Sequence, residues 1–387
     1  MKTFPKTFAS FVEERYPFFV KILETENPPG EEDEMAEVLR EEMNYLGAKS
    51  RKDATGNLIG YLGEGKHVFM LGGHMDSVQP CKDVKVVRAG DIIKSDGLTV
   101  LTADDGAGLF EILTALRYLK ENNLDHCPID LLFTVGEEIG GIGVSKLKKD
   151  LLRARQGLLL DRADDPGSFV IAGPYKRNFK VVFEGTASHA FEAEKGVSAI
   201  HMAAAAIAQF PQGKIHDELY ANIGMIEGGV SVNQVAERAV LEGEVRAFTS
   251  LDAEKLFEEY QRIIDSIKYK FSASGEFTPN AHLEYTSRRE GYKHDPNMPL
   301  IKALCTVHEE IGLKADMQIT RACSDAGDLT NKGIATINYS NAAHCTHTKD
   351  EWVDMKDVIR IIWMLVNLLQ YIGEHSEVLT PQKSKKK

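Results

Sequence analysis

The chain has 387 residues, of which 43% are apolar and 27% charged; this is an ordinary globular composition, and the length favours two domains. Its net charge of −12 argues against binding nucleic acid through a general basic surface. No apolar run is long enough to cross a bilayer, and the N-terminus lacks the apolar core of a signal peptide. Five cysteines without CxxC spacing favour a reducing, cytoplasmic compartment. The lysine-rich end, residues 383–387, reads as a solvated terminus.

Helices and strands alternate in the first half of the chain. Apolar residues at helical spacing predict a helix over 31–46, with Gly47 as its stop, and a second helix over 109–119. Short apolar runs predict buried strands over 68–71, 129–135 and 158–160. This rhythm is typical of an α/β domain with a mostly parallel sheet between helices, a three-layer arrangement.

The pattern changes near Pro174. Alternating polar and apolar residues predict strands over 178–184 and 239–248, with one face covered by helices over 196–210 and 253–271. We therefore expect an inserted α+β domain with an antiparallel sheet over residues 175–288.

After Pro296 the first pattern returns. It predicts a helix over 298–311, a strand over 333–338 and a closing helix over 355–372. The α/β domain is therefore expected to comprise residues 1–174 and 289–387.

Polar residues lie at the ends of the predicted elements of the α/β domain, mostly directly after a strand and, in one case, before the helix over 109–119. They are His74, Asp76, Asp104, Asp105, Glu137, Glu138 and Asp161, with His344 and His347 late in the chain. Sites in open α/β sheets form outside the carboxyl ends of the strands. Imidazole and carboxylate together suit zinc, and also cobalt or manganese. The sequence thus predicts a metal site with enough side chains for two ions that share one carboxylate.

Each segment also has a plainer interpretation. Asp104 and Asp105 could cap the helix that follows them, Asp161 could be a turn residue, and His347 could be a loop histidine. The combination carries the argument, because acids and histidines follow successive elements in order. Asp76 is also placed to accept the second ring N–H of the histidine two residues before it.

Read in order, these segments resemble a family of co-catalytic zinc peptidases that includes peptidase T, carboxypeptidase G, aminoacylase and succinyl-diaminopimelate desuccinylase. The resemblance covers nearly the whole chain. The matching motifs are Pro28-Pro-Gly-Glu-Glu32, Gly56-Asn-Leu-Ile59, Gly73-His-Met-Asp76, Ala103-Asp-Asp-Gly-Ala-Gly108, Gly136-Glu-Glu138, Leu160-Asp161, Gly185-Thr-Ala-Ser-His-Ala190, Ser324-Asp-Ala326 and His347-Thr-Lys-Asp-Glu351.

The resemblance implies a dinuclear zinc centre. Its ligands would be His74 and Asp161 on one ion, Glu138 and His347 on the other, and Asp104 between them. Asp76 would orient the first histidine, and Glu137 would be the general base. His347 is preferred to His344, which stays the alternative, because the family's last ligand lies shortly before a glutamate, here Glu351.

The resemblance also assigns roles in the inserted domain, which would be a lid. His189 would polarise the scissile carbonyl, in many relatives from a partner subunit, and this allows a homodimer through the lid domain. Asn233 and Arg246 would contact the substrate, with Arg246 a candidate for its carboxylate. The plainer alternatives are a turn cap for Asn233 and surface pairing for Arg246.

Three positions depart from the family: Gly106 replaces a lysine, and Phe191 and Ala193 replace a glycine and a proline. They affect the expected substrate more than metal binding. Asp161, where deacylases commonly have glutamate, resembles the aminopeptidase and tripeptidase side. We therefore expect hydrolysis of short peptides. The alternatives are an N-acyl amino acid amidohydrolase and a non-catalytic metal-binding relative, against which the intact Glu137 argues.

Overall fold

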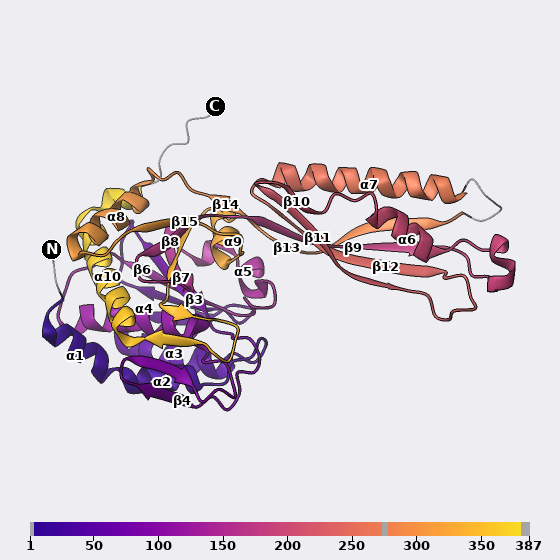
Figure 1. Cartoon of the computed structure of the whole chain (residues 1–387). Coiled ribbons are helices and arrows are strands. Elements are labelled where there is room, and N and C mark those ends of the chain that lie inside the picture. The colour runs from indigo at the N-terminus through magenta and orange to yellow at the C-terminus, as the bar shows by residue number, and fades with distance from the viewer. Residues whose placement is uncertain (1–3, 273–277, 381–387) are drawn as a thin grey trace. The chain divides into compact units, whose positions relative to one another are not determined.

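The computed structural model describes residues 4–272 and 278–380, and within them the chain forms two compact units (Figure 1). Unit 1 comprises Met1–Ala172, Lys293–Thr320 and Ser324–Lys387, and unit 2 comprises Gly173–Tyr292 and Arg321–Cys323. The expected insertion over 175–288 lies within the first part of unit 2. Unit 2 also includes the short segment Arg321–Cys323, which no pattern in the sequence predicts. The lysine-rich end, 383–387, lies outside the described residues.

Unit 1 is built on a mixed sheet in the order β1-β2-β6-β3-β7-β16-β8-β14, with β15 beside β8. The strands are β1 (Lys49–Lys52), β2 (Leu58–Leu62), β3 (Phe69–His74), β6 (Ile129–Thr134), β7 (Gln156–Arg162), β8 (Ser168–Gly173), β14 (Tyr292–Lys293), β15 (Asp316–Ile319) and β16 (Ala335–Ser340). The four central strands β6, β3, β7 and β16 run parallel, which confirms the expected sheet.

The central strands are buried along nearly their whole length and mostly apolar, because both faces of the sheet are covered. Every residue of β3 and of β6 is buried. Phe69 and Leu71 pack into the main core together with Leu131 and Leu158, while the intervening Met70 is also fully buried. A sheet covered on both sides favours continuous apolar runs over alternation.

The described helices of unit 1 are α1 (Lys6–Glu14), α2 (Tyr16–Glu24), α3 (Asp33–Leu46), α4 (Ala103–Glu121), α5 (Ile142–Lys146), α8 (Pro299–Ile311), α9 (Asp325–Asn331) and α10 (Met355–Glu374), with short 3₁₀ turns η1 (Lys149–Leu151) and η3 (Ser376–Leu379). α4 packs on β3 and β7 beside α2, α3 and α10, whereas α9 packs on β16. α3 ends at Gly47, whose φ of 88° is left-handed, as predicted. None of the described helices has the length and apolar character of a membrane span.

A small antiparallel sheet brings the end of the chain to the segment before α4. Its order is β17-β18-β5-β4, with β17 (Ala343–His344), β18 (Trp352–Asp354), β5 (Ile92–Ser95) and β4 (Val86–Ala89). Trp352 of β18 pairs with Lys94 of β5. Residues just before β18 therefore come close to those that follow β5.

Unit 2 is an antiparallel sheet with helices on one face (Figure 1). Its order is β10-β11-β12-β9-β13, with β9 (Tyr175–Glu184), β10 (Gly213–His216), β11 (Leu219–Gly228), β12 (Arg238–Ala247) and β13 (Asn280–Arg289). α6 (Ala199–Ile207) and α7 (Ser250–Ser272) cover it, and η2 (Ala190–Lys195) is a 3₁₀ turn. Its apolar core, which includes Phe179, Leu241 and Tyr260, is separate from that of unit 1. The predicted α+β fold is confirmed.

Candidate functional site

Strand and helix ends in unit 1 bring together the five side chains that the motifs suggested as ligands. His74 Nε2 lies 3.4 Å from Asp104 Oδ1 and 3.5 Å from Asp161 Oδ1. His347 Nε2 lies 3.3 Å from Asp104 Oδ2 and 3.0 Å from Glu138 Oε1. His74 ends β3 and Asp161 lies near the end of β7, so parallel strands deliver both to one edge of the sheet.

Asp104 stands between the two halves of this cluster. Its Oδ1 faces one histidine and its Oδ2 faces the other, which is the arrangement of a carboxylate that two cations can share. Donor atoms of His74, Asp104 and Glu138 all lie within 4.8 Å of one another. Glu138 Oε1 is buried, with His347 Nε2 3.0 Å away. Mixed imidazole and carboxylate donors that face one another in this way fit divalent cations.

The hydrogen bond of His74 fixes its tautomer. Nδ1 lies 2.7 Å from the backbone carbonyl oxygen of Asp76. A carbonyl oxygen only accepts, so Nδ1 carries a hydrogen, and Nε2 is the ring nitrogen that faces the carboxylates. The motif predicted this role for the Asp76 carboxylate, whose Oδ1 lies 3.7 Å from Nδ1, farther than the carbonyl oxygen of the same residue.

The Asp76 carboxylate instead holds the loop after β6. Its Oδ1 accepts the backbone N–H of Glu137 at 2.9 Å, and its Oδ2 accepts that of Glu138 at 3.1 Å. The side chain is fully buried, and a buried carboxylate needs strong donors, which two backbone N–H groups supply. Gly136, which precedes this pair in the loop, is held in the same way by Glu32, whose Oε1 accepts from Gly136 N at 3.1 Å.

Asp105 is also fully buried, but its hydrogen bonds go to groups other than the histidine rings. Its Oδ2 accepts from the backbone N–H of His74 at 3.2 Å, and its Oδ1 accepts from Asn341 Nδ2 at 3.0 Å. The N-cap residue of α4 is Thr102, which makes no side-chain cap bond, and both aspartates stand in the first turn of the helix. The carboxylate of Asp105 is enclosed so closely that a Cβ on Gly73 would lie 2.0 Å from its Oδ2.

Glu351 was used in the sequence only to locate the last ligand, but it is part of the site. Its Oε2 accepts from Leu101 N at 2.7 Å and from Thr102 N at 3.0 Å, and its Oε1 accepts from Asp104 N at 2.9 Å. The side chain is 1% exposed. The spacing His347-Thr-Lys-Asp-Glu351 is the signal by which it could have been found.

The charges of the cluster act on one another. Burial raises the pKa of Asp161 to about 6, against the lowering effect of His74. Burial also opposes ionisation of Asp104, but hydrogen bonds with His347 and His74 outweigh it and lower its pKa. Asp104 and Glu138 raise the pKa of His347 to about 10. Burial, with the charge of Asp104, raises the pKa of Glu351 to about 7. Acidic groups thus outnumber the histidines that neutralise them, which favours a bound cation.

The second candidate histidine lies elsewhere. His344 stacks on Trp352 with ring centroids 4.2 Å apart, and its Nε2 lies 3.9 Å from Asp165 Oδ1. The geometry therefore places His347, rather than His344, against Asp104 and Glu138.

The three predicted lid residues belong to unit 2. His189 is exposed, and its Nδ1 accepts from Phe191 N at 3.2 Å. Asn233 accepts a hydrogen bond from Ser231 Oγ within its own turn. Arg246 pairs with Glu244 on the same strand at 2.9 Å and donates to Arg321 O at 2.7 Å. The plainer alternatives for Asn233 and Arg246, a turn contact and surface pairing, are thus present in the structure.

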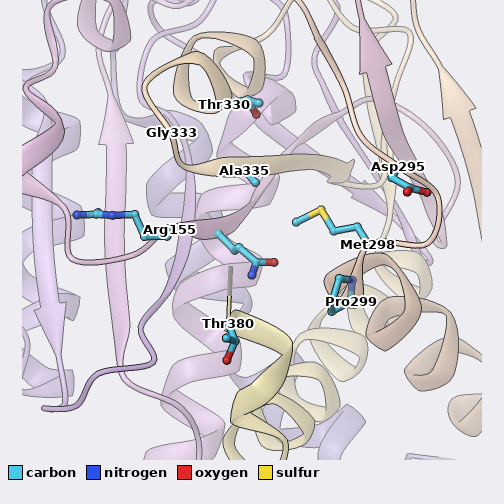
Figure 2. Close-up of a pocket in the computed structure, with 9 residues that line it drawn as sticks. Arg155, Asp295, Met298, Pro299, Thr330, Gly333, Ala335 and Thr380 are labelled. Atoms are coloured by element: carbon cyan, nitrogen blue, oxygen red, sulfur yellow. The ribbon is translucent and has the colours of Figure 1, made fainter. Parts of the chain in front are cut away.

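A cavity of about 430 Å³ lies at the other edge of the sheet, where β7 and β16 begin (Figure 2). Gln156, Met298, Pro299 and Ala335 are among its lining residues. Gln156 Nε2 donates to Val378 O at 3.0 Å. None of the predicted site residues lines this cavity, so it is separate from the histidine and carboxylate cluster.

The sequence was compared with known proteins. The profile of "Peptidase family M20/M25/M40" matches residues 70–371. The chain is 30% identical over 364 residues to "Uncharacterized protein YqjE" of Bacillus subtilis (strain 168), which covers 91% of this chain and 96% of YqjE. It is 26% identical over 293 residues to peptidase T of Shouchella clausii, which covers 74% of this chain and 69% of that protein.

The solved structures that resemble this chain include an aminopeptidase and a tripeptidase. The crystal structure of aminopeptidase PepT from Bacillus cereus ATCC 10987 has a TM-score of 0.86 at 29% identity, and covers 94% of this chain and 99% of that chain. A tripeptidase from Staphylococcus aureus Mu50 has a TM-score of 0.85 at 27% identity, with the same coverage of both chains.

Proposed function

Because this chain belongs to peptidase family M20/M25/M40, we propose that it is a dinuclear zinc aminopeptidase that acts on short peptides. That it is a peptide-bond hydrolase of the peptidase T type follows from the family and from its PepT neighbours. The main support for a dinuclear zinc centre is the position of Asp104, which has one carboxylate oxygen towards each of the two histidines, His74 and His347.

In this proposal His74 and Asp161 hold one ion, Glu138 and His347 hold the other, and Asp104 bridges them. The interatomic distances of 3.0–3.5 Å among these side chains support this division. The donor set supports zinc, with cobalt or manganese as alternatives.

Two divalent ions at such a site supply Lewis acidity towards the scissile carbonyl and lower the pKa of the attacking water. Glu137 takes the proton of that water on its carboxylate and passes it to the nitrogen of the leaving amine. Asp76 holds the backbone of Glu137 in place for this transfer. His189 polarises the carbonyl, and Asn233 and Arg246 bind the rest of the peptide, with Arg246 at its carboxylate.

The aminopeptidase assignment is supported by the two solved neighbours, which are named an aminopeptidase and a tripeptidase, and by Asp161. The second candidate is an N-acyl amino acid amidohydrolase, and the third a metal-binding relative without turnover. A panel of dipeptides, tripeptides and acylated amino acids separates these functions. Hydrolysis of free-amino tripeptides that chelator abolishes supports the proposal, and hydrolysis confined to acylated amino acids contradicts it.

The general base is tested with neighbouring substitutions. Glu137→Ala is expected to bind both ions and to lose turnover by roughly 10²- to 10⁴-fold, because only proton transfer is removed. Glu138→Ala, one residue on, is expected to lose bound metal. Metal content and steady-state kinetics of both proteins provide the measurement. Normal turnover in Glu137→Ala would show that the base is misassigned.

A homodimer through the lid domain is part of the proposal. It is supported by two apolar side chains of β11, Met225 and Ile226, which are each 55% exposed and which a partner subunit could cover. Sedimentation equilibrium of the wild-type protein is the test, and a monomer at micromolar concentration counts against it.

A further inference from the structure

We propose that Glu351 is a positioning residue that fixes the backbone from which Asp104 projects. The inference rests on the proposed function, in which Asp104 is the shared ligand. The carboxylate of Glu351 accepts three backbone N–H groups, from Leu101, Thr102 and Asp104, at 2.7, 3.0 and 2.9 Å. These donors lie 247 to 250 residues away in sequence, so the contact joins two distant parts of the chain.

The contacts exclude a role for Glu351 as a metal ligand. Both of its oxygens are directed at backbone N–H groups, and the side chain is 1% exposed. Charge-assisted bonds of this kind are roughly twice as strong as neutral ones. Glu351 therefore acts on the site through the chain segment that it holds.

The segment that Glu351 holds has a conformation that needs support. Thr102 has a φ of 63°, which is an outlier for a β-branched residue. Its N–H is bonded to Glu351, and its hydroxyl donates to Leu23 O at 2.7 Å. Without the carboxylate, Thr102 would be free to relax towards negative φ and would carry Asp104 with it.

Glu351 also links the two halves of the cluster. A backbone bond of 3.2 Å from Glu351 N to Thr348 O closes the turn Thr348–Glu351, which directly follows His347. The pairing of β18 with β5 brings this turn to the segment before α4. Glu351 thus connects the segment that follows His347 with the segment that carries Asp104, and the side chains of these two residues lie 3.3 Å apart.

The test compares Glu351→Ala with Asp130→Asn. Asp130 is a matched control because its buried carboxylate also holds backbone N–H groups, those of Arg153 and Ala154, but at the start of β6. In metal-free protein, hydrogen exchange of the peptide over 99–107 is expected to be faster in Glu351→Ala only. Zinc affinity, measured by competition with a chromogenic chelator, is expected to fall by roughly 10- to 100-fold in Glu351→Ala and to stay unchanged in Asp130→Asn.

Glu351→Gln keeps one acceptor oxygen and turns an N–H₂ group towards the remaining backbone donors, so an intermediate zinc affinity is expected. This variant serves if Glu351→Ala does not fold, and a wild-type affinity in it would overturn the proposal. So would a Glu351→Ala protein that binds zinc as Asp130→Asn does. If the wild-type protein binds no zinc, the proposed function is wrong. The hydrogen-exchange measurement still tests, in that case, whether Glu351 holds residues 101–104.

Discussion

Adjacent acids in this chain have different tasks because their surroundings differ. Asp104 directs its carboxylate at two histidines, whereas Asp105 gives both oxygens to nitrogen donors at 3.2 and 3.0 Å. Gly73 makes the second arrangement possible, since any side chain there would collide with the Asp105 carboxylate. Residue type alone does not distinguish the two aspartates; the neighbours of each do.

His308 provides a prediction about stability and pH. It is fully buried, and burial lowers its pKa from 6.5 to about 4, while its Nε2 lies 2.8 Å from Tyr339 Oη. The unfolded chain binds this proton first as the pH falls. The contribution to stability is therefore complete above about pH 6.5 and is lost as the pH falls towards 4. The shift corresponds to about 3 kcal/mol of unfolding free energy.

Urea unfolding of wild type and His308→Gln at several pH values between 7 and 4 measures this effect. Gln can keep the bond to Tyr339 but does not titrate, so the variant is expected to lose less stability across the interval. His201→Gln, at an exposed position on α6, is the control. Parallel stability curves for wild type and His308→Gln would refute the assignment.

At the scale of elements, the loop after β6 is held by carboxylates from other segments. Asp76 takes the backbone N–H groups of Glu137 and Glu138, and Glu32 takes that of Gly136. The loop needs such support because it follows the end of a strand and has no ladder partners of its own. Its conformation thus depends on parts of the chain that precede it by many residues.

Asp76→Asn tests this support. The amide replaces one acceptor oxygen by a donor that faces a backbone N–H, so the loop is expected to loosen. Both zinc affinity and kcat are expected to fall by roughly 10- to 100-fold, the effect usual for partners of metal ligands. Asp96→Asn, in an exposed turn where Oδ1 accepts from Leu98 N, is the control. Equal kinetics and affinity in the two variants would count against the loop's dependence on Asp76.

The elements themselves were largely predictable from the sequence. Buried strands and amphipathic helices follow from local apolar patterns, as in β3 and α3, and their order gave the α/β domain and its α+β insertion. The proximity of the two histidines and the carboxylates was also predictable, because polar residues at the ends of apolar segments are easily noticed. The acceptor of the His74 ring N–H was not predictable, because it is a backbone carbonyl and every residue has one. Arg321–Cys323 and the three bonds of Glu351 depend on contacts between distant segments, which local patterns do not encode.

At the scale of the whole molecule, the two units have separate apolar cores. All the proposed metal ligands lie in unit 1, so bound metal should stabilise that unit alone. A ligand at 100 times its Kd adds about 2.7 kcal/mol to the stability of the form that binds it. Multi-domain proteins commonly unfold in more than one step.

Calorimetry with and without a chelator tests this expectation. Two transitions are expected, of which one moves to lower temperature when metal is removed and the other stays in place. Adding zinc back should restore the first. A single transition, or an equal shift of both, would mean that the units do not unfold separately.

The strand order of unit 1 has a consequence for how the protein is made. β16 lies between β7 and β8, so these two earlier strands cannot be joined until residue 340 has left the ribosome. The core of unit 2 draws on residues 179–283, all translated before β16. The inserted unit is thus able to fold first, during synthesis. The sheet that carries the site cannot be completed until β16 has been made. His347 and Glu351 emerge later still, so a nascent chain gains the complete cluster only after residue 351 has left the ribosome.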